Sequence, residues 1–543
     1  MAKEPAVIDV TPKGTLAIGG GLEGAERTSR ETFRWNPVVI HPDQQINPVK
    51  DMADARSRDI VQNDGYATGA LHTHRDSIVG SQYMLNAQPN YEVLGADEGW
   101  AEEFQAVAEG RFNLMSDSED CWFDASGTMT LTGLVRLAVG GYMFTGEVLA
   151  TAEWLRDSSR PFRTAVQMVA PARLSNPDGM WDDRYLRRGI QQDMFGRPLG
   201  YHIRIGHPGS HFYLNPMDEF KWVYVPARKP WGRKQVIHIY EPMQPNQSRG
   251  IADMVAALKQ MRMTKKFQDV TLQNAVVNAS YAAAVESELP REVVFGSLGA
   301  GQQEFGKMLG DYMSALQSYV AGSQNIAIDG VKMPHLFPGT KLNLKPMGTP
   351  GGVGTDFEES LLRHTAAALG LSYEQFSRDY TKTNYSSARA SMVETWKFMQ
   401  GRKKQVADRF AKNIYLLWLE EEINAGNIPL PKGKGPEIFY DPVMREALAQ
   451  CDWIGASRGQ IDELKETQSA VMRIKSGLST REIECARLGL DWRKVYRQRA
   501  REMSLEKELG LTFDSDPTKP GVNDAQNTMR GGQQDNAASE EDQ

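Results

Sequence analysis

The spacing of apolar residues changes from a strand-like to a helix-like pattern between residues 195 and 285. Four apolar side chains stand two residues apart, which places them on one face of a predicted strand: Leu199, Tyr201, Ile203 and Ile205. Residues 236–240 (Val-Ile-His-Ile-Tyr) are β-branched and aromatic, and they predict a second strand. Residues 245–250 (Pro-Asn-Gln-Ser-Arg-Gly) favour a turn. A helix is therefore predicted to begin at Ile251.

Residues 251–289 contain neither glycine nor proline and are predicted to be helical. They begin with an apolar stripe at helical spacing: Ile251, Met254, Val255, Leu258 and Met261. One continuous helix of this length would extend about 55 Å, which is longer than a small core requires. Such a helix packs best beside copies of itself. The alternative is two helices separated near residues 274–278, where weak helix formers gather.

Shorter elements are predicted before and after this helix. Residues 31–250 indicate a loop-rich α/β region, in which residues 142–154 and 163–169 are strand candidates. Residues 286–352 are dense in Gly and Pro and predict short strands and turns, with one candidate helix near residues 302–320. A further helix over residues 357–369 is stopped by Gly370.

A polar stretch over residues 377–385 (Ser-Arg-Asp-Tyr-Thr-Lys-Thr-Asn-Tyr) favours a loop. Ser386 or Ser387 is predicted to cap the next helix. That helix carries four apolar residues at helical spacing: Val406, Phe410, Ile414 and Leu417. Its outer face carries six basic residues: Lys397, Arg402, Lys403, Lys404, Arg409 and Lys412. Such a face is either solvated and ion-paired or in contact with phosphates, and the sequence leaves both interpretations open.

The C-terminal part is predicted to be mostly helical over residues 460–509. Ser479-Thr480-Arg481-Glu482 is a capping box that begins a short helix, and Asp491 caps the next one. Many arginines are present here, but interleaved acidic residues offset them, which argues against sequence-specific DNA recognition. Residues 1–30 predict a flexible arm, and the residues from about 511, with seven acids and two bases, predict a disordered tail.

Composition sets limits on the class of protein. The 543 residues suffice for several domains, and 62 basic against 69 acidic residues give a net charge of −7, which argues against a protein that wraps nucleic acid with a globally basic surface. The three cysteines, Cys121, Cys451 and Cys485, are widely spaced and predict reduced thiols. The sequence has neither a membrane-spanning apolar run nor a signal-peptide pattern, so we expect no membrane association.

No residue pattern makes a convincing catalytic, metal or cofactor site. His202, His207 and His211 are the strongest zinc candidates, but glycines and a proline separate them. His72 and His74 would share a strand face and lack nearby carboxylate or cysteine ligands. Gly455-Ala456-Ser457-Arg458-Gly459 matches a nucleophile motif with no histidine downstream, and the glycine-rich residues 348–355 lack the lysine of a phosphate loop. The sequence therefore predicts no ATP-binding site in this chain.

Six segments, in this order, carry a resemblance to a known family: IHIYEPMQPNQSRG, IADMVAALKQMRM, YAAAVESEL, FEESLLRHTAAALGLSYEQFSRDY, NYSSARAS and CDWIGASRGQIDELKE. They resemble the lambda-like family of tailed-bacteriophage portal proteins, over about residues 30–500. The resemblance implies a mixed α+β portal fold, of which about twelve copies close into a ring around a DNA-sized channel at one vertex of the viral shell.

By position, the resemblance assigns a role to each part of the chain. The parts are a flexible N-terminal arm (1–30), the wing (31–250), the first stem helix (251–285), the clip (286–352), the second stem helix (353–371), the channel loop (372–388), a long helix with the wing and crown connection (389–449), the crown (450–510) and a disordered acidic tail (511–543).

The channel loop is the candidate site. Its predicted DNA-facing residues are Arg378, Asp379, Tyr380, Thr381, Lys382, Asn384 and Tyr385. The cations can meet phosphates, the tyrosines can slide along a groove edge, and Asp379 limits the attraction.

The resemblance implies a structural protein of the virion, assembled in the host cytoplasm, that serves genome packaging, retention and ejection. Its expected partners are further copies of itself, double-stranded DNA, the terminase large subunit, the major capsid protein, scaffold and a head-completion protein. Two rival classes stay open at this point. One is a nuclease or processing protease that acts on viral DNA or capsid chains, and the other is a monomeric DNA-binding adaptor with strongly salt-dependent affinity.

Overall fold

The computed structural model describes residues 9–10, 16–17, 32–210, 220–280, 310, 313–314, 326–328, 331–333, 353–457 and 463–511. Its mixture of helices and strands confirms the predicted α+β class. The chain forms two compact units, each built from separate stretches of sequence. The first comprises Met1–Leu71, Met143–Gly146 and Gln244–Thr395, and the second comprises His72–Tyr142, Glu147–Met243 and Trp396–Gln543.

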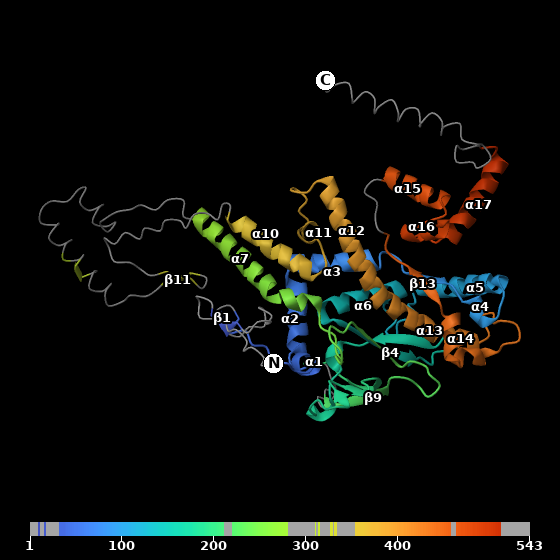
Figure 1. The fold of residues 1–543 in the computed structure, drawn as a ribbon, viewed down its shortest axis with the longest axis horizontal. Coiled ribbons are helices and arrows are strands. Elements are labelled where there is room, and N and C mark those ends of the chain that lie inside the picture. The colour runs from blue at the N-terminus through green and yellow to red at the C-terminus, as the bar shows by residue number, and fades with distance from the viewer. Residues whose placement is uncertain are drawn as a thin grey trace, which may run out of the picture. The chain divides into compact units, whose positions relative to one another are not determined.

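Helices dominate the described part of the first unit. They are α1 (Pro42–Ile46), α2 (Lys50–Asn63), a 3-10 turn (Asp253–Ala257), α7 (Leu258–Ser280), α10 (Val353–Ala368) and α11 (Tyr373–Ser377), with the first part of α3 (Gly65–Ile78) and of α12 (Tyr385–Arg402). Helices α7 and α10 lie side by side (Figure 1), and the rings of Phe267 and Phe357 meet edge to face at 6.1 Å between centroids. Gln268 donates a hydrogen bond from α7 to Glu358 on α10.

The long helix begins later than the sequence predicted. Residues 253–257 form a 3-10 turn and α7 starts at Leu258, because Ala252 offers no side-chain cap for the first N–H groups and a tighter turn satisfies them instead. Of the predicted stripe, Met254 and Met261 are buried. Helix α7 continues through residues 274–278 to Ser280, which contradicts the alternative of two helices separated there, and residues 281–289 lie outside the described part.

A glycine permits a close backbone approach in the first unit. Gly146 has φ +74°, and a Cβ atom there would lie 2.1 Å from the backbone of Ile251. Any other residue would be strained and would displace the segment before α7. The strand predicted from residue 142 is therefore shorter: residues 142–145 end helix α6 (Leu131–Thr145), and the strand begins after Gly146. Helix α6 lacks a polar face, so its pattern of apolar residues does not distinguish a buried helix from a strand.

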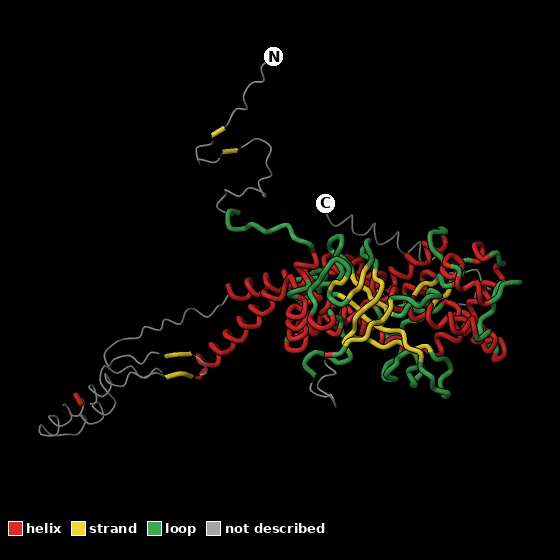
Figure 2. Tube along the Cα trace, turned by 90° about the horizontal axis from the view of Figure 1, so that it is seen from below, coloured by secondary structure: helices red, strands yellow, loops and turns green. Residues whose placement is uncertain are grey.

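Two antiparallel sheets and their shared core organise the second unit. The first sheet has the order β10–β4–β5, with β4 (Glu147–Trp154), β5 (Thr164–Met168) and β10 (Val236–Tyr240). The second runs in sequence order through β6 (Leu186–Arg187), β7 (Ile190–Gln192), β8 (Pro198–Arg204) and β9 (Trp222–Pro226). Residues of both sheets form one apolar cluster, and Figure 2 shows the strands close together. Of the predicted face of β8, Tyr201 and Ile203 are buried, whereas Leu199 and Ile205 at its ends are exposed.

Helix α13 (Arg409–Asn424) is largely buried. All four predicted core residues, Val406, Phe410, Ile414 and Leu417, are at most 2% exposed. The helix is preceded by a π-helical turn (Lys403–Asp408). Around it lie aromatic residues of other elements, among them Phe112 of α5 (Glu98–Ser116), whose ring is 5.1 Å from that of Trp418. The predicted periodicity therefore identified a true core helix.

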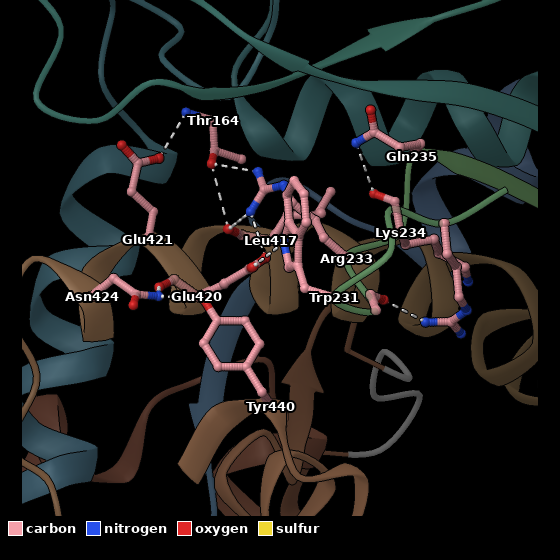
Figure 3. Close-up of polar contacts among 12 residues, drawn as sticks. Thr164, Trp231, Arg233, Lys234, Gln235, Leu417, Glu420, Glu421, Asn424 and Tyr440 are labelled. Carbon is pink, nitrogen blue, oxygen red and sulfur yellow. Dashed lines mark hydrogen bonds and ion pairs between the residues drawn. The ribbon is translucent and has the colours of Figure 1, made fainter. Parts of the chain in front are cut away.

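Buried polar contacts attach α13 to the first sheet (Figure 3). The Arg233 guanidinium lies 2.6 Å from a Glu420 carboxylate oxygen, and it also donates to the Leu417 carbonyl and the Thr164 hydroxyl. The Trp231 indole N–H donates to the same Glu420 carboxylate at 3.1 Å. The Arg233 and Glu420 side chains are both 8% exposed. Because both charges are buried, removal of one partner costs about 3–5 kcal/mol.

The basic outer face of this helical segment is largely ion-paired. Lys403 pairs with Asp408 at 2.9 Å, Lys412 pairs with Glu446 at 2.9 Å, and Arg402 lies 3.5 Å from Glu241. The structure thus favours the ion-paired interpretation for these positions over a phosphate-binding face.

Most of residues 463–509 are helical, as predicted, and form α15 (Glu463–Lys475), α16 (Arg481–Arg487) and α17 (Trp492–Leu509). Asp491 caps α17, but the cap of α16 is Thr480, which accepts from Ile483 N at 3.2 Å, and not Ser479. The Glu484 carboxylate in α16 accepts from Arg473, and this hydrogen bond lowers the pKa of Glu484 to about 2.

The remaining described elements are short. They are α4 (Tyr91–Leu94), α14 (Pro442–Leu448), 3-10 turns at Pro171–Arg173, Pro177–Gly179 and Pro436–Tyr440, the paired strands β3 (Met84–Ala87) and β13 (Cys451–Ile454), and the strand pairs β1 (Asp9–Val10) with β2 (Leu16–Ala17) and β11 (Ile326–Ile328) with β12 (Val331–Met333). The predicted arm and clip, the candidate helix near residues 302–320 and the acidic tail lie mostly outside the described residues. Within the described part, no helix is long and apolar enough to span a membrane.

Candidate functional site

The predicted loop lies in the first unit, between two helices. Helix α10 ends at Ala368, and Gly370, with φ +66°, lets the chain reverse before α11. Arg378 ends α11 in the left-handed region at φ +60°. The irregular segment is thus residues 378–384, and the predicted loop of residues 372–388 contains the one-turn helix α11 and the start of α12.

Asn384 caps α12, so the prediction of Ser386 or Ser387 was wrong. The Asn384 side chain accepts from Ser387 N at 2.9 Å, and the Ser387 hydroxyl accepts from Asn384 N at 3.2 Å. These two reciprocal hydrogen bonds form a capping box that begins earlier in the sequence than predicted. Serine takes the place of the usual glutamate in this box. The box fixes the point at which the loop ends.

Apolar packing anchors the other end of the loop. Phe376 of α11 is 3% exposed, and its ring stacks on that of Tyr66 in α3 at 5.6 Å. Burial, with Glu358 nearby, raises the pKa of the Tyr66 hydroxyl. The Ser372 hydroxyl accepts from Gln375 N at 3.3 Å and caps α11. Packing and the helix cap therefore hold the residues at this end of the loop in place.

Asp379 organises the interior of the loop. One of its carboxylate oxygens accepts from the Thr381 hydroxyl at 2.7 Å and from Thr381 N at 3.0 Å. The Asp379 N–H donates to Ser377 at 3.2 Å. The hydrogen bond from the Thr381 hydroxyl lowers the pKa of Asp379, which keeps the carboxylate charged. Asp379 and Thr381 thus act mainly on the shape of the loop.

Lys382 reaches across to helix α10. Its ammonium group donates to Glu359, whose other oxygen lies 3.0 Å from Arg363, one turn further along α10. The Lys382 hydrogen bond lowers the pKa of Glu359, and the same contact raises the pKa of Lys382. Sequence reasoning missed Glu359. The only signal for it was the i,i+4 pair of Glu359 and Arg363 on a predicted helix.

Three of the seven predicted residues present cationic or aromatic side chains to solvent. Arg378 is exposed, Tyr380 is 54% exposed, and the Lys382 side chain is 66% exposed. Asn384 serves as the helix cap, and the side chain of Tyr385 lies outside the description. The arrangement offers weak, exchangeable contacts to an anionic surface, because each exposed ion pair contributes about 1 kcal/mol or less.

The other candidate chemistry does not assemble into a site in the described part of the chain. His72 and His74 lie in helix α3, so the expectation of a shared strand face was wrong, and His74 packs edge to face on Phe398 at 6.1 Å. His202 lies in β8 against the Tyr224 ring, and His211 falls outside the description. No three described His, Cys, Asp or Glu side chains are placed to hold a metal ion.

The structure also bears on the predictions for the three cysteines and for the nucleophile motif. All three cysteines are free thiols, as predicted. Of the residues that matched a nucleophile motif, Gly455 follows strand β13 and lies against Tyr83, whereas Arg458 and Gly459 are outside the described part.

Comparison with known proteins gives a consistent result along the chain. Residues 28–403 match the family model described as phage portal protein, lambda family. The chain is 39% identical over 495 residues to portal protein B of Escherichia phage lambda, which covers 91% of this chain and 90% of that protein. It is 38% identical over 496 residues to the portal protein of Escherichia phage N15, with coverage of 91% and 90%. Among solved structures, it is similar to a chain in the neck of an empty GTA particle computed with C6 symmetry, with a TM-score of 0.37, 11% identity and coverage of 80% and 93%.

Proposed function

Because this chain belongs to the lambda family of phage portal proteins, we propose that about twelve copies of it close into a ring whose channel carries double-stranded DNA at one vertex of a phage capsid. The family membership carries this conclusion. It makes the chain a structural portal protein and favours this function over the alternative of a nuclease or protease.

Exposed apolar residues on α7 and α10 support association with further copies. Met263, Val270 and Leu272 on α7 are 52%, 54% and 65% exposed, and Phe357 on α10 is 52% exposed. Single exposed apolar side chains are common, but several along one helix pair favour burial against another protein surface. In a closed ring, each copy would cover this surface on its neighbour.

Helices α7 and α10 are proposed as the described parts of the two stem helices. Residues 286–352 connect them and would form the clip, which docks the terminase large subunit during packaging and a head-completion protein afterwards. The wing (31–250) and crown (450–510) would meet the major capsid protein, scaffold and packaged DNA. The ring would assemble in the host cytoplasm and remain in the virion.

The loop of residues 378–384 is proposed to line the narrowest part of the channel. Arg378 and Lys382 would contact phosphates and Tyr380 would contact the groove edge, while Asp379 and Thr381 keep the loop in shape. Lys382 would exchange Glu359 for a phosphate oxygen, at little net cost because both partners are anionic and the Lys382 side chain is exposed to water. Twelve such contacts can hold DNA without stopping it.

The loop is tested by replacement of Arg378, Tyr380 and Lys382 together with alanine. The ring should assemble normally, as measured by native mass spectrometry, while the length or retention of packaged DNA changes. The matched control is Arg184→Ala with Lys432→Ala, which removes two exposed cations in other parts of the chain. Normal packaging and retention by the triple variant would show that this loop is not the constriction.

The ring and the clip have separate tests. Native mass spectrometry that finds only monomers or twofold dimers would contradict the ring. Deletion of residues 300–325 should give shells that form but remain empty, because the motor would have no docking surface. Normal filling by that variant would contradict the assignment of the clip.

A further inference from the structure

A small cavity in the second unit is surrounded by cations. It has a volume of about 240 Å³ and lies between residues 228–234, helix α13 and helix α14. Six basic side chains line it against two acidic ones: Arg228, Arg233, Lys234, Arg409, Lys412 and Arg445, with Glu420 and Glu446. The whole chain carries a net charge of −7, so this concentration of positive charge is opposite in sign to the protein around it.

Both acidic side chains at the cavity already form ion pairs with cations. Glu420 pairs with Arg233 at 2.6 Å, and Glu446 pairs with Lys412 at 2.9 Å. Figure 3 shows the first of these pairs, with Lys234 close by. Arg228, Lys234, Arg409 and Arg445 remain, and none of them has an acidic side chain within 4.0 Å among the residues that the structure describes.

Two of these four cations donate hydrogen bonds to neutral groups. Arg228 donates to the Gly232 carbonyl at 3.0 Å, and Lys234 donates to the Asn413 side-chain oxygen at 2.8 Å. Burial, together with Arg228 and Arg409, lowers the pKa of Lys234 to about 8. Arg228 has a pKa lowered by burial and by Arg445. The cations at the cavity therefore repel one another, and Glu446 offsets part of this repulsion at Arg228 and Lys234.

We propose that this cavity is an oxyanion site, which takes one carboxylate or phosphate group between Arg228, Lys234, Arg409 and Arg445. An anion would remove the mutual repulsion and accept charge-assisted hydrogen bonds from arginine and lysine. The cavity volume is sufficient for one such group. The cavity is too small to hold a DNA duplex, whose major groove alone is about 12 Å wide. The site is separate from the loop of residues 378–384 and does not depend on the ring.

Two sources of the oxyanion are distinguishable. One is inorganic phosphate from the solution. The other is the chain itself, whose residues 512–543 carry seven acids and two bases and end in Ser-Glu-Glu-Asp-Gln. At about 3.3 Å per extended residue, that segment is long enough to reach across a domain.

The test is a titration of the full chain with phosphate, compared with chloride at equal ionic strength to remove general screening. Phosphate should raise the unfolding temperature of the wild type. In the variant Arg228→Ala with Arg445→Ala, the apparent dissociation constant for phosphate should rise at least about tenfold. The control, Arg184→Ala with Arg501→Ala, removes two exposed arginines outside the cavity and should behave as wild type.

A second measurement separates a binding site from a merely structural cluster. Without phosphate, the Arg228→Ala and Arg445→Ala variant should be as stable as wild type or more stable, because it relieves repulsion. Equal responses to phosphate and chloride, or equal phosphate affinity in variant and wild type, would overturn the proposal.

The source is decided with a synthetic peptide of residues 535–543. Competition between this peptide and phosphate would identify the carboxylates of the chain as an occupant. Phosphate binding without peptide binding would identify phosphate as the ligand. Absence of both would again overturn the oxyanion site, whereas the ring could fail to form without any effect on these results.

Discussion

Two carboxylates in this protein have similar partners and different surroundings. Glu420 on α13 pairs with Arg233 and accepts from Trp231, and both charged side chains are 8% exposed. Glu359 on α10, whose side chain is 15% exposed, pairs with Lys382 and Arg363, whose side chains are 66% and 57% exposed. The first pair cannot separate without leaving a buried charge, and the second exchanges freely with water and ions. Burial, rather than the number of partners, decides which contact fixes the fold and which is available to another ligand.

The largest expected effect follows from removal of the buried carboxylate. Glu420→Ala leaves Arg233 buried without its charge partner, so the free energy of unfolding should fall by about 3–5 kcal/mol. Urea denaturation measures this loss. The control Glu446→Ala breaks the pair with Lys412, where the Glu446 side chain is 55% exposed, and should cost about 1 kcal/mol or less. Similar losses in both variants would break the comparison.

A third carboxylate sharpens the comparison, because it is buried and its cationic partner lies beyond hydrogen-bond distance. Glu109 accepts from Ala87 N at 2.8 Å, while Arg493 is 3.8 Å away, and burial raises the pKa of Glu109 to about 7. The folded state binds this proton more tightly than the unfolded state, so the associated stability is present below about pH 4.5 and is lost as the pH rises through about 7. The full change is on the order of 3 kcal/mol.

Denaturation at several pH values tests this. Wild type should lose stability between pH 5 and pH 7.5 relative to Glu109→Gln, in which the amide cannot ionise. Parallel pH profiles for the two proteins would show that Glu109 does not titrate in this range.

The exposed pair should affect DNA more than stability. Glu359→Gln removes the anion that holds Lys382, so the loop gains positive charge and should retain packaged DNA more firmly. The free energy of unfolding should change by about 1 kcal/mol or less. DNA release from filled particles measures the first effect and denaturation measures the second. A large loss of stability with unchanged release would reverse the roles given to the two carboxylates.

The smallest expected effect is a local titration. The pKa of Glu359 is lowered by Lys382, so the contact is complete above the ordinary glutamate pKa of about 4.5 and is lost as the pH falls through the lower folded value. The nitrogen NMR chemical shift of the Lys382 ammonium group should therefore be constant between pH 5 and 7 and should change only at more acidic pH. A change near neutral pH would show that the contact is not with Glu359.

The local pattern of residues was sufficient to predict an element where one face of that element is buried. The sequence predicted β10 at residues 236–240, the four buried residues of α13 and of the π-helical turn before it, and the stop at Gly370, because period and glycine act within a few residues. It failed for α6, which lacks a polar face, and for His72 and His74, whose two-residue spacing fits a strand as well as a helix. The family, too, was identified from segments in order along the chain.

The sequence by itself therefore determined the family, the class of fold, the core helix and the approximate place of the loop. Only the tertiary structure decided which charges meet. Glu359 and Lys382 are separated by a reversal of the chain, and Arg233 and Glu420 are 187 residues apart in a stretch that includes residues 244–395 of the first unit, so no local rule links them. The same holds for the four cations of the cavity. Distance in space and exclusion of water set the strength of these contacts, and both properties arise only when the separate stretches of each unit fold together.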